Sequence, residues 1–152
     1  MLPNFFRFFI RIVFFLTFFC FNVSAEFLSV KTKNSILFEG PSSSTKKKFI
    51  VTEGYPLKVL VSLKDWKKVE DHLGKISWVR TKDLDRERTV MTLKSEVTIY
   101  NKPSINQSKL AYVDEFVVLN LVSPIVTDGW IKVKSTTVGL EGFIKVEEVW
   151  GI

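Results

Sequence analysis

The only histidine of the chain, His72, is the first candidate for chemistry, because it follows two acidic residues in Glu70-Asp71-His72. A metal site needs about three or four converging ligands, and the sequence has no second histidine to contribute one. Neighbouring residues of a strand point to opposite faces, so Glu70 and Asp71 are not expected to work as an acid/base pair. We therefore expect His72 to be a solvated turn histidine and predict no metal site.

Nucleophilic catalysis requires a serine or cysteine with a base within hydrogen-bond reach. The one base of this kind, His72, stands in a predicted turn, and the one cysteine, Cys20, lies in the apolar N-terminal stretch. The sequence also contains no glycine-rich phosphate cradle. We predict that the protein is not an enzyme and that it uses no cofactor.

Paired aromatic residues are the second candidate. DWKKVEDHLGKISWV (65–79) and DGWIKVKSTTVGLEGFI (128–144) each carry an aromatic at the same two places. Trp66 and Trp130 follow turns and precede predicted strands, so each either stacks on a ligand or covers the core, and large aromatics most often serve burial. Trp78 and Phe143 replace each other between the two segments. Such an exchange suits packing, so we expect both in the core.

The first 25 residues have the pattern of a secretory signal. Arg7 and Arg11 are followed by an apolar run over 12–21 and by small residues up to Ala25. The alternative is an uncleaved anchor, but a spanning helix needs about 20 apolar residues. Phe19 occupies the place where a lipid-modified cysteine at position 20 would need a small residue. We predict cleavage after Ala25, export across the inner membrane to the periplasm, and no membrane span thereafter.

Removal of residues 1–25 would leave 127 residues and lower the formal net charge from +6 to +4, because Arg7 and Arg11 are lost. A mildly basic secreted chain suits anionic polymers of the envelope, and we expect no nucleic-acid partner there. The only cysteine is removed too, so no disulfide can form and stability must come from the apolar core.

Short alternating or β-branched segments bounded by turn residues dominate the rest of the chain, and this pattern predicts strands. Many short strands with close turn signals favour small barrels, and hence an all-β fold. The segments are 27–33, 55–63, 88–93, 97–100, 110–113, 116–122, 130–133 and 139–146. We interpret Lys46-Lys47-Lys48 as a solvated loop and 83–88 as a closing turn and linker.

An internal repeat links the two halves. Residues 37–41 match 99–103, Trp66 and Val69 match Trp130 and Val133, and 74–79 match 139–144, with an offset that drifts only from 62 to 65. Two copies of one barrel of about sixty residues explain this pattern. We predict one domain over 26–87 and a second over 88–152.

The first copy contains Gly40-Pro41, Gly54-Tyr55-Pro56-Leu57, Trp66-Lys67-Lys68-Val69 and Trp78-Val79, in this order. With these motifs each copy resembles the bacterial SH3-like (SH3b) domain. Ser29-Val30-Lys31, Arg88-Thr89-Val90 and the terminal Trp150-Gly151-Ile152 are similar to a two-repeat, secreted type from alphaproteobacteria. The resemblance extends over essentially all of the chain after residue 25, and it implies two tandem SH3-like barrels.

The resemblance implies a binding function, because related modules attached to cell-wall hydrolases target peptidoglycan. We expect a non-catalytic secreted module that binds a cell-wall peptide or polymer. The alternative is an envelope protein-interaction or scaffold role without cell-wall binding. Eukaryotic relatives bind polyproline peptides on an aromatic face, which Phe38, Tyr55 and Tyr100 would line here. In the opening motif, Ile36 and Phe38 replace the Asn and Arg that the bacterial family prefers. The candidate ligand-binding residues are Phe38, Tyr55, Trp66, Tyr100 and Trp130.

Overall fold

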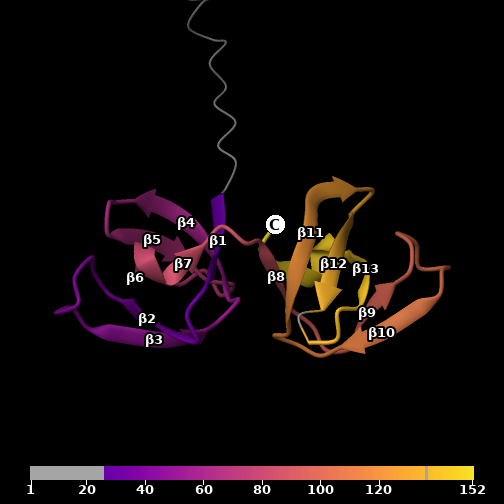
Figure 1. Cartoon of the computed structure of the whole chain (residues 1–152), viewed down its shortest axis with the longest axis horizontal. Coiled ribbons are helices and arrows are strands. Elements are labelled where there is room, and N and C mark those ends of the chain that lie inside the picture. The colour runs from indigo at the N-terminus through magenta and orange to yellow at the C-terminus, as the bar shows by residue number, and fades with distance from the viewer. Residues whose placement is uncertain (1–25, 136) are drawn as a thin grey trace, which may run out of the picture.

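The computed structural model describes residues 26–135 and 137–152, and its regular elements are almost all strands, in two seven-stranded antiparallel sheets. Figure 1 shows the two sheets side by side, the first in indigo to magenta and the second in orange to yellow. The predicted all-β fold of two units is confirmed. The predicted signal peptide over 1–25 lies outside the described residues.

The first sheet has the strand order β3-β2-β6-β5-β4-β1-β7. Its strands are β1 (Glu26–Val30), β2 (Asn34–Phe38), β3 (Lys47–Thr52), β4 (Pro56–Ser62), β5 (Trp66–Glu70), β6 (Ile76–Arg80) and β7 (Leu84–Asp85), with the 3-10 turn η1 (Thr81–Asp83) before β7. We call β1–β7 and their connections repeat 1. Of the three lysines predicted to form a solvated loop, Lys47 and Lys48 instead belong to β3, and the Lys48 ammonium donates a hydrogen bond to the Ile76 carbonyl (2.9 Å).

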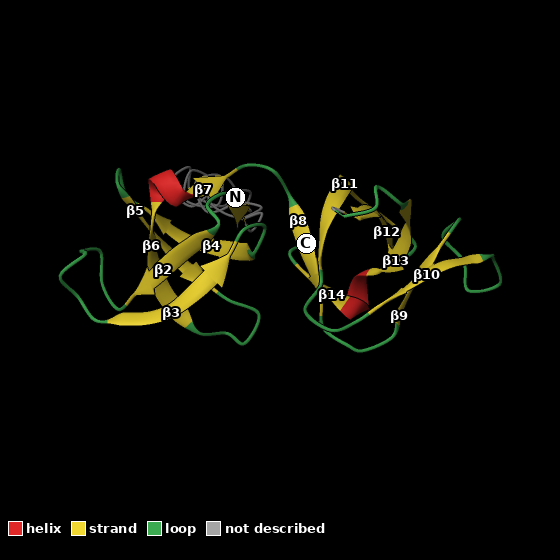
Figure 2. Ribbon diagram, turned by 60° about the horizontal axis from the view of Figure 1, so that its bottom comes forward, coloured by secondary structure: helices red, strands yellow, loops and turns green. Residues whose placement is uncertain are grey.

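The second sheet has the order β10-β9-β13-β12-β11-β8-β14, which is the first order shifted by seven strands. Its strands are β8 (Thr89–Thr92), β9 (Val97–Tyr100), β10 (Lys109–Val113), β11 (Val118–Thr127), β12 (Trp130–Ser135), β13 (Glu141–Lys145) and β14 (Val149–Trp150), with η2 (Val146–Glu148) before β14. We call this unit repeat 2. The shared order agrees with the internal repeat in the sequence. Figure 2 shows the single short helical turn in each repeat.

Each sheet surrounds its own aliphatic core. Matching positions supply matching side chains, such as Leu37 and Ile99, or Val79 and Ile144, all at 1% exposure or less. The repeat 1 cluster consists of Leu28, Val30, Leu37, Val51, Leu57, Val69, Val79 and Leu84. The repeat 2 cluster consists of Val90, Val97, Ile99, Leu119, Leu121, Ile131, Val133, Ile144 and Val149. Burial of these side chains, about 1.5–3 kcal/mol each, drives folding without disulfides.

The prediction that Trp78 and Phe143 fill the core is wrong. Ser77 and Val79 on β6 are buried and Trp78 between them is half-buried; Gly142, Phe143 and Ile144 show the same pattern on β13. Alternate residues of a strand face opposite sides. Both aromatics therefore lie on the outer side of their sheet, opposite the core.

The repeats meet near the middle of Figure 1, between the strands labelled β1 and β8. Strand β4 contacts β8, and the C-terminal strand β14 contacts β1 and β4. The rings of Phe27 and Trp150 pack edge to face with centroids 5.3 Å apart, and the Trp150 indole N–H donates to the Pro56 carbonyl (3.3 Å). The Arg88 guanidinium lies 5.5 Å from the Phe27 ring centroid and donates to the Gly151 carbonyl (2.7 Å). The Thr89 hydroxyl donates to the Gly54 carbonyl (2.6 Å). These contacts join the two units directly.

No helix in the described part of the chain is both long and apolar enough to cross a membrane.

Candidate functional site

The outer side of repeat 1 carries a cluster of three aromatic rings, which we call aromatic cluster 1: Phe38, Trp66 and Trp78. Phe38 on β2 is paired with Trp78 on β6, and the rings of Phe38 and Trp66 meet edge to face with centroids 5.3 Å apart. Phe38 is buried, whereas both tryptophans are half-buried. Phe38 therefore supports two indoles that remain in part accessible to solvent.

Repeat 2 has the equivalent aromatic cluster 2: Tyr100, Trp130 and Phe143. Tyr100 on β9 pairs with Phe143 on β13, and Tyr100 and Trp130 meet edge to face at 5.4 Å. Here the tryptophan is the buried member, with 8% exposure, and Tyr100 and Phe143 are half-buried. Four of the five predicted site residues thus lie in these two clusters. Sequence reasoning did not include Trp78 and Phe143, because it assigned both to the core.

A basic cleft adjoins aromatic cluster 1. Its volume is about 510 Å³, and it is lined by Ser43, Lys64, Asp65, Trp66, Arg80, Thr81 and Lys82. The Arg80 guanidinium lies 5.9 Å from the Trp66 ring centroid, and its Nη2 donates to the Ser43 hydroxyl (2.6 Å). An indole and a guanidinium, each held in place, therefore form two sides of one cleft.

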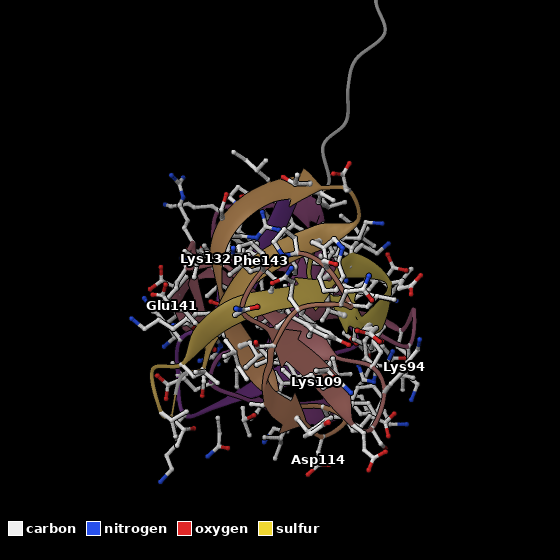
Figure 3. The ribbon with its side chains drawn as sticks, turned by 90° about the vertical axis from the view of Figure 1, so that its right-hand side faces the viewer. Lys94, Lys109, Asp114, Lys132, Glu141 and Phe143 are labelled. Atoms are coloured by element: carbon white, nitrogen blue, oxygen red, sulfur yellow. The ribbon has the colours of Figure 1, made fainter. Side chains whose placement is uncertain are left out.

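The outer side of repeat 2 has a different charge arrangement. Lys145, at the position that matches Arg80, is paired with Glu147 (3.6 Å). Glu141 accepts from Lys132 (2.9 Å) and lies 3.5 Å from Lys134. The hydrogen bond and positive charge of Lys132, aided by Lys134, hold the pKa of Glu141 below its ordinary value. Figure 3 shows Lys132, Glu141 and Phe143 on this side of the sheet. The cations beside aromatic cluster 2 are thus matched by carboxylates.

Tyr55 lies apart from both clusters, on the side of repeat 1 that meets repeat 2. Its hydroxyl forms a 2.6 Å hydrogen bond with Nδ1 of His72, and the His72 ring lies 5.4 Å from the ring of Phe116. Burial, with the charge of nearby Asp71, raises the pKa of Tyr55 to about 12. The phenol is therefore neutral at physiological pH, and it serves here as a hydrogen-bonding group.

His72 does lie in a turn, but the prediction that it is solvated is wrong. Its side chain is half-buried between Tyr55 and Phe116. The turn is fixed by Asp71, whose buried Oδ1 accepts the backbone N–H groups of Leu73 and Lys75, both at 2.9 Å. The carboxylate of Asp71 is thus occupied by the turn, and the imidazole is a contact between the repeats.

One sequence signal pointed to this contact. Phe116 stands where the repeat alignment places Gly54, and both have positive φ angles, 63° and 80°. A bulky residue seldom adopts this conformation, and Phe116 is also 54% exposed. An aromatic at a glycine position of a turn is therefore a sign of a contact outside its own barrel.

A second cleft, also of about 510 Å³, lies between the repeats. It is lined by Ser29, Val30, Lys31, Glu53, Gly54, Asp85, Glu87, Thr89, Val118 and Asn120. Its lining has three carboxylates and one lysine, so it is acidic. The described residues nevertheless contain no group of three or more side chains placed to hold a metal ion. Aromatic cluster 1 with its basic cleft remains the better candidate, because it combines stacking surfaces with charge.

No family model matches the sequence, and no curated protein matches it. Among solved structures, NlpC2 from Trichomonas vaginalis aligns with a TM-score of 0.37 at 15% identity over 85% of this chain and 49% of its own. NlpC1 from the same organism gives 0.38 at 15% identity over 85% and 46%. An NlpC/P60 family protein from Bacillus cereus gives 0.37 at 16% identity over 82% and 55%. The chain spans about half the length of these structures, and likeness at this level identifies neither its family nor its activity.

Proposed function

We propose that the protein is a non-catalytic binding module of the cell envelope that takes a cell-wall peptide or polymer of peptidoglycan. The observation that supports this most is aromatic cluster 1, which has two half-buried indoles, of which that of Trp66 lies beside the guanidinium of Arg80. Aromatic side chains offer a large contact area at low cost in conformational entropy. They therefore suit a ligand that is gripped without being transformed.

The charges around this surface favour an anionic polymer. The formal net charge of +4 that remains without residues 1–25 attracts polyanions over a Debye length of about 8–10 Å. The described contacts also support a non-catalytic role, because neither hydroxyl of the cleft is hydrogen-bonded to a base: the Ser43 hydroxyl accepts from Arg80, and the Thr81 hydroxyl has no hydrogen-bond partner among the described residues. The signal pattern of residues 1–25 would deliver such a module to the periplasm.

Co-sedimentation with purified sacculi tests the proposal. We expect the wild-type protein to be enriched in the pellet and Trp66→Ala to bind at least about tenfold more weakly, since stacking aromatics are often worth 1.4 kcal/mol or more. Tyr112→Ala is the matched control, because Tyr112 is 66% exposed on repeat 2 and away from the cleft. Wild-type enrichment no greater than that of an unrelated protein of equal charge would refute cell-wall binding.

One observation favours envelope protein interaction as the second candidate. Beside aromatic cluster 1 the outer side continues with Ile36, Ile50 and Ile76, of which Ile50 is 70% and Ile76 48% exposed. Repeat 2 has Thr98, Tyr112 and Glu141 at the matching places. A photo-crosslinker at position 50 should then capture one envelope protein in intact cells, and the same group at Ile125, also exposed, should not. Equal capture at both positions would speak against a specific partner.

A further inference from the structure

We infer that the basic cleft beside Trp66 is a binding site for the carboxylate of a short peptide, and that repeat 1 alone carries it. The identity of this peptide as a cell-wall component rests on the proposed function; the carboxylate chemistry does not.

Arg80 is held in position but retains hydrogen-bonding capacity. A guanidinium has five N–H donors, and among the described residues its side chain donates one hydrogen bond, to Ser43. The four ion pairs of the described chain involve none of Arg80, Lys64 and Lys82. The Trp66 ring on one side and Ser43 on the other fix the orientation of the group. Its remaining donors are therefore available to an oxyanion.

The matching place in repeat 2 has the opposite charge. The cleft of repeat 1 combines Lys64, Arg80 and Lys82 with one acid, Asp65, for a formal charge of +2. The equivalent positions of repeat 2 hold Asp128, Gly129, Lys145 and Glu147, for a charge of −1, and Lys145 is paired with Glu147. Ser43 is replaced by Ile105, an exposed aliphatic residue. The same fold thus offers an anion site once and not twice.

The surroundings select a peptide carboxylate. The fork of a guanidinium matches the planar carboxylate in a bidentate arrangement. The indole of Trp66, continued by Phe38 and Trp78, adjoins the cation, so a ligand with a charged end and an aliphatic body satisfies both parts. Lys64 and Lys82 are exposed and add attraction at longer range. A peptide C-terminus has this combination of a carboxylate and small apolar side chains.

The site can be tested by nuclear magnetic resonance of the protein as the cell produces it. The indole N–H signals are the readout, and Trp66 supplies one of them. The probes are Ala-Ala-Ala with a free carboxylate and the same peptide with a C-terminal amide. We expect the free acid to shift the Trp66 signal in a saturable way, and the amide to bind at least about tenfold more weakly, the usual effect of losing a charge-assisted hydrogen bond. Raising the salt concentration should weaken the binding of the free-acid peptide and leave the binding of the amide unchanged.

Arg80→Gln is the test variant and Lys145→Gln its matched control. We expect Arg80→Gln to lower the affinity for the free acid at least about tenfold and Lys145→Gln to leave it within twofold. If Arg80→Gln disturbs the fold, as judged from its spectrum, Arg80→Lys replaces it: this variant keeps the charge, loses the fork and should bind several-fold more weakly.

Three results would overturn the assignment. The first is equal affinity for the free acid and the amide, and the second is an equal loss of affinity in both glutamine variants. The third is a higher affinity for inorganic phosphate than for the free acid, measured by displacement of the peptide. The sacculus experiment separates this inference from the proposed function. Free-acid binding without sacculus binding would support the carboxylate site and refute the cell-wall ligand. Trp66-dependent sacculus binding without free-acid binding would support the cell-wall ligand and refute the carboxylate site.

Discussion

Trp66 and Trp130 occupy the same position of the repeat and have different environments. Trp130 is 8% exposed in aromatic cluster 2, whereas Trp66 is half-buried and forms one side of the basic cleft. The partner ring compensates for this difference, because Phe38 is buried and Tyr100 is half-buried. Repetition of the fold thus preserves the aromatic contact while it changes which ring is accessible.

This difference predicts unequal costs of truncation. We expect Trp130→Ala to lower the free energy of unfolding by about 3–5 kcal/mol and Trp66→Ala by roughly half of that, because a smaller part of Trp66 leaves water on folding. Urea denaturation followed by circular dichroism measures both values. Equal losses in the two variants would show that Trp66 is as much a structural residue as Trp130.

Tyr55 predicts a pH dependence of stability. Burial raises its pKa to about 12 from an ordinary value of 10. The unfolded chain therefore releases this proton first as the pH rises, and the folded state holds it longer. The stability is fully present below pH 10 and falls as the pH rises from about 10 to about 12. Urea midpoints at pH 9.5 and 11.5 should show a larger drop for wild type than for Tyr55→Phe.

The measurement is the comparison between the two proteins, since they differ in no other titratable group. His72→Ala provides the second reference, because it removes the hydrogen-bond partner of the phenol and leaves the phenol itself. An identical pH dependence in wild type and Tyr55→Phe would contradict the raised pKa.

At the scale of elements, β6 and β13 solve one packing problem with different residues. Ser77 on β6 and Gly142 on β13 hold matching inward positions, and both are buried. The Ser77 hydroxyl has no hydrogen-bond partner among the described residues. A Cβ placed on Gly142 would lie 2.7 Å from the Tyr100 carbonyl oxygen and would also collide with Ile99. Strand β13 therefore approaches β9 more closely than a side chain allows.

This contrast predicts opposite results for one substitution type. Ser77→Ala should leave stability unchanged or raise it by up to about 1 kcal/mol, because it removes a buried hydroxyl that has no partner. Gly142→Ala should lower it by at least about 2 kcal/mol, because the obstacle is backbone and an overpacked core cannot relax freely. Thermal unfolding of both variants measures the difference. A Gly142→Ala protein as stable as wild type would show that β9 can move away.

The all-β class and the repetition of one unit follow from the sequence, because the alternation of apolar residues and the repeated motifs are local signals. The order of the strands within each sheet does not, because it depends on pairing between distant segments. The orientation of a strand is harder to obtain. In the segment from Ile76 to Arg80 both alternating sets contain apolar residues, and size favours Trp78 for the core. The structure selects Val79 instead, since a small barrel already filled by valine and leucine has no space for an indole. The contact of His72 with Phe116 depends on the placement of the repeats, which no local pattern specifies.

At the scale of the whole molecule, the contacts between the repeats raise the question of whether they unfold together. Each repeat has its own core cluster, so each has the means for independent stability. Phe27, Pro56 and Trp150 nevertheless join the sheets by an edge-to-face ring contact and a hydrogen bond. The His72–Phe116 contact and the hydrogen bond from Thr89 to Gly54 add to this interface. Two barrels unfold together when the free energy of the contacts between them exceeds the difference between the unfolding free energies of the two barrels.

We expect one calorimetric unfolding transition for wild type and two for Trp150→Ala, because the truncation removes both the ring contact and the hydrogen bond that reach repeat 1. Trp78→Ala is the matched control: it removes the same side chain from the outer side of β6, away from the interface, so it should lower the transition temperature without splitting the transition. Because Trp150 belongs to β14, truncating it also destabilises repeat 2 itself. Phe27→Leu is therefore the complementary test from repeat 1, since it keeps an apolar side chain and removes only the ring. A single transition in both interface variants would mean that the remaining contacts alone couple the two barrels.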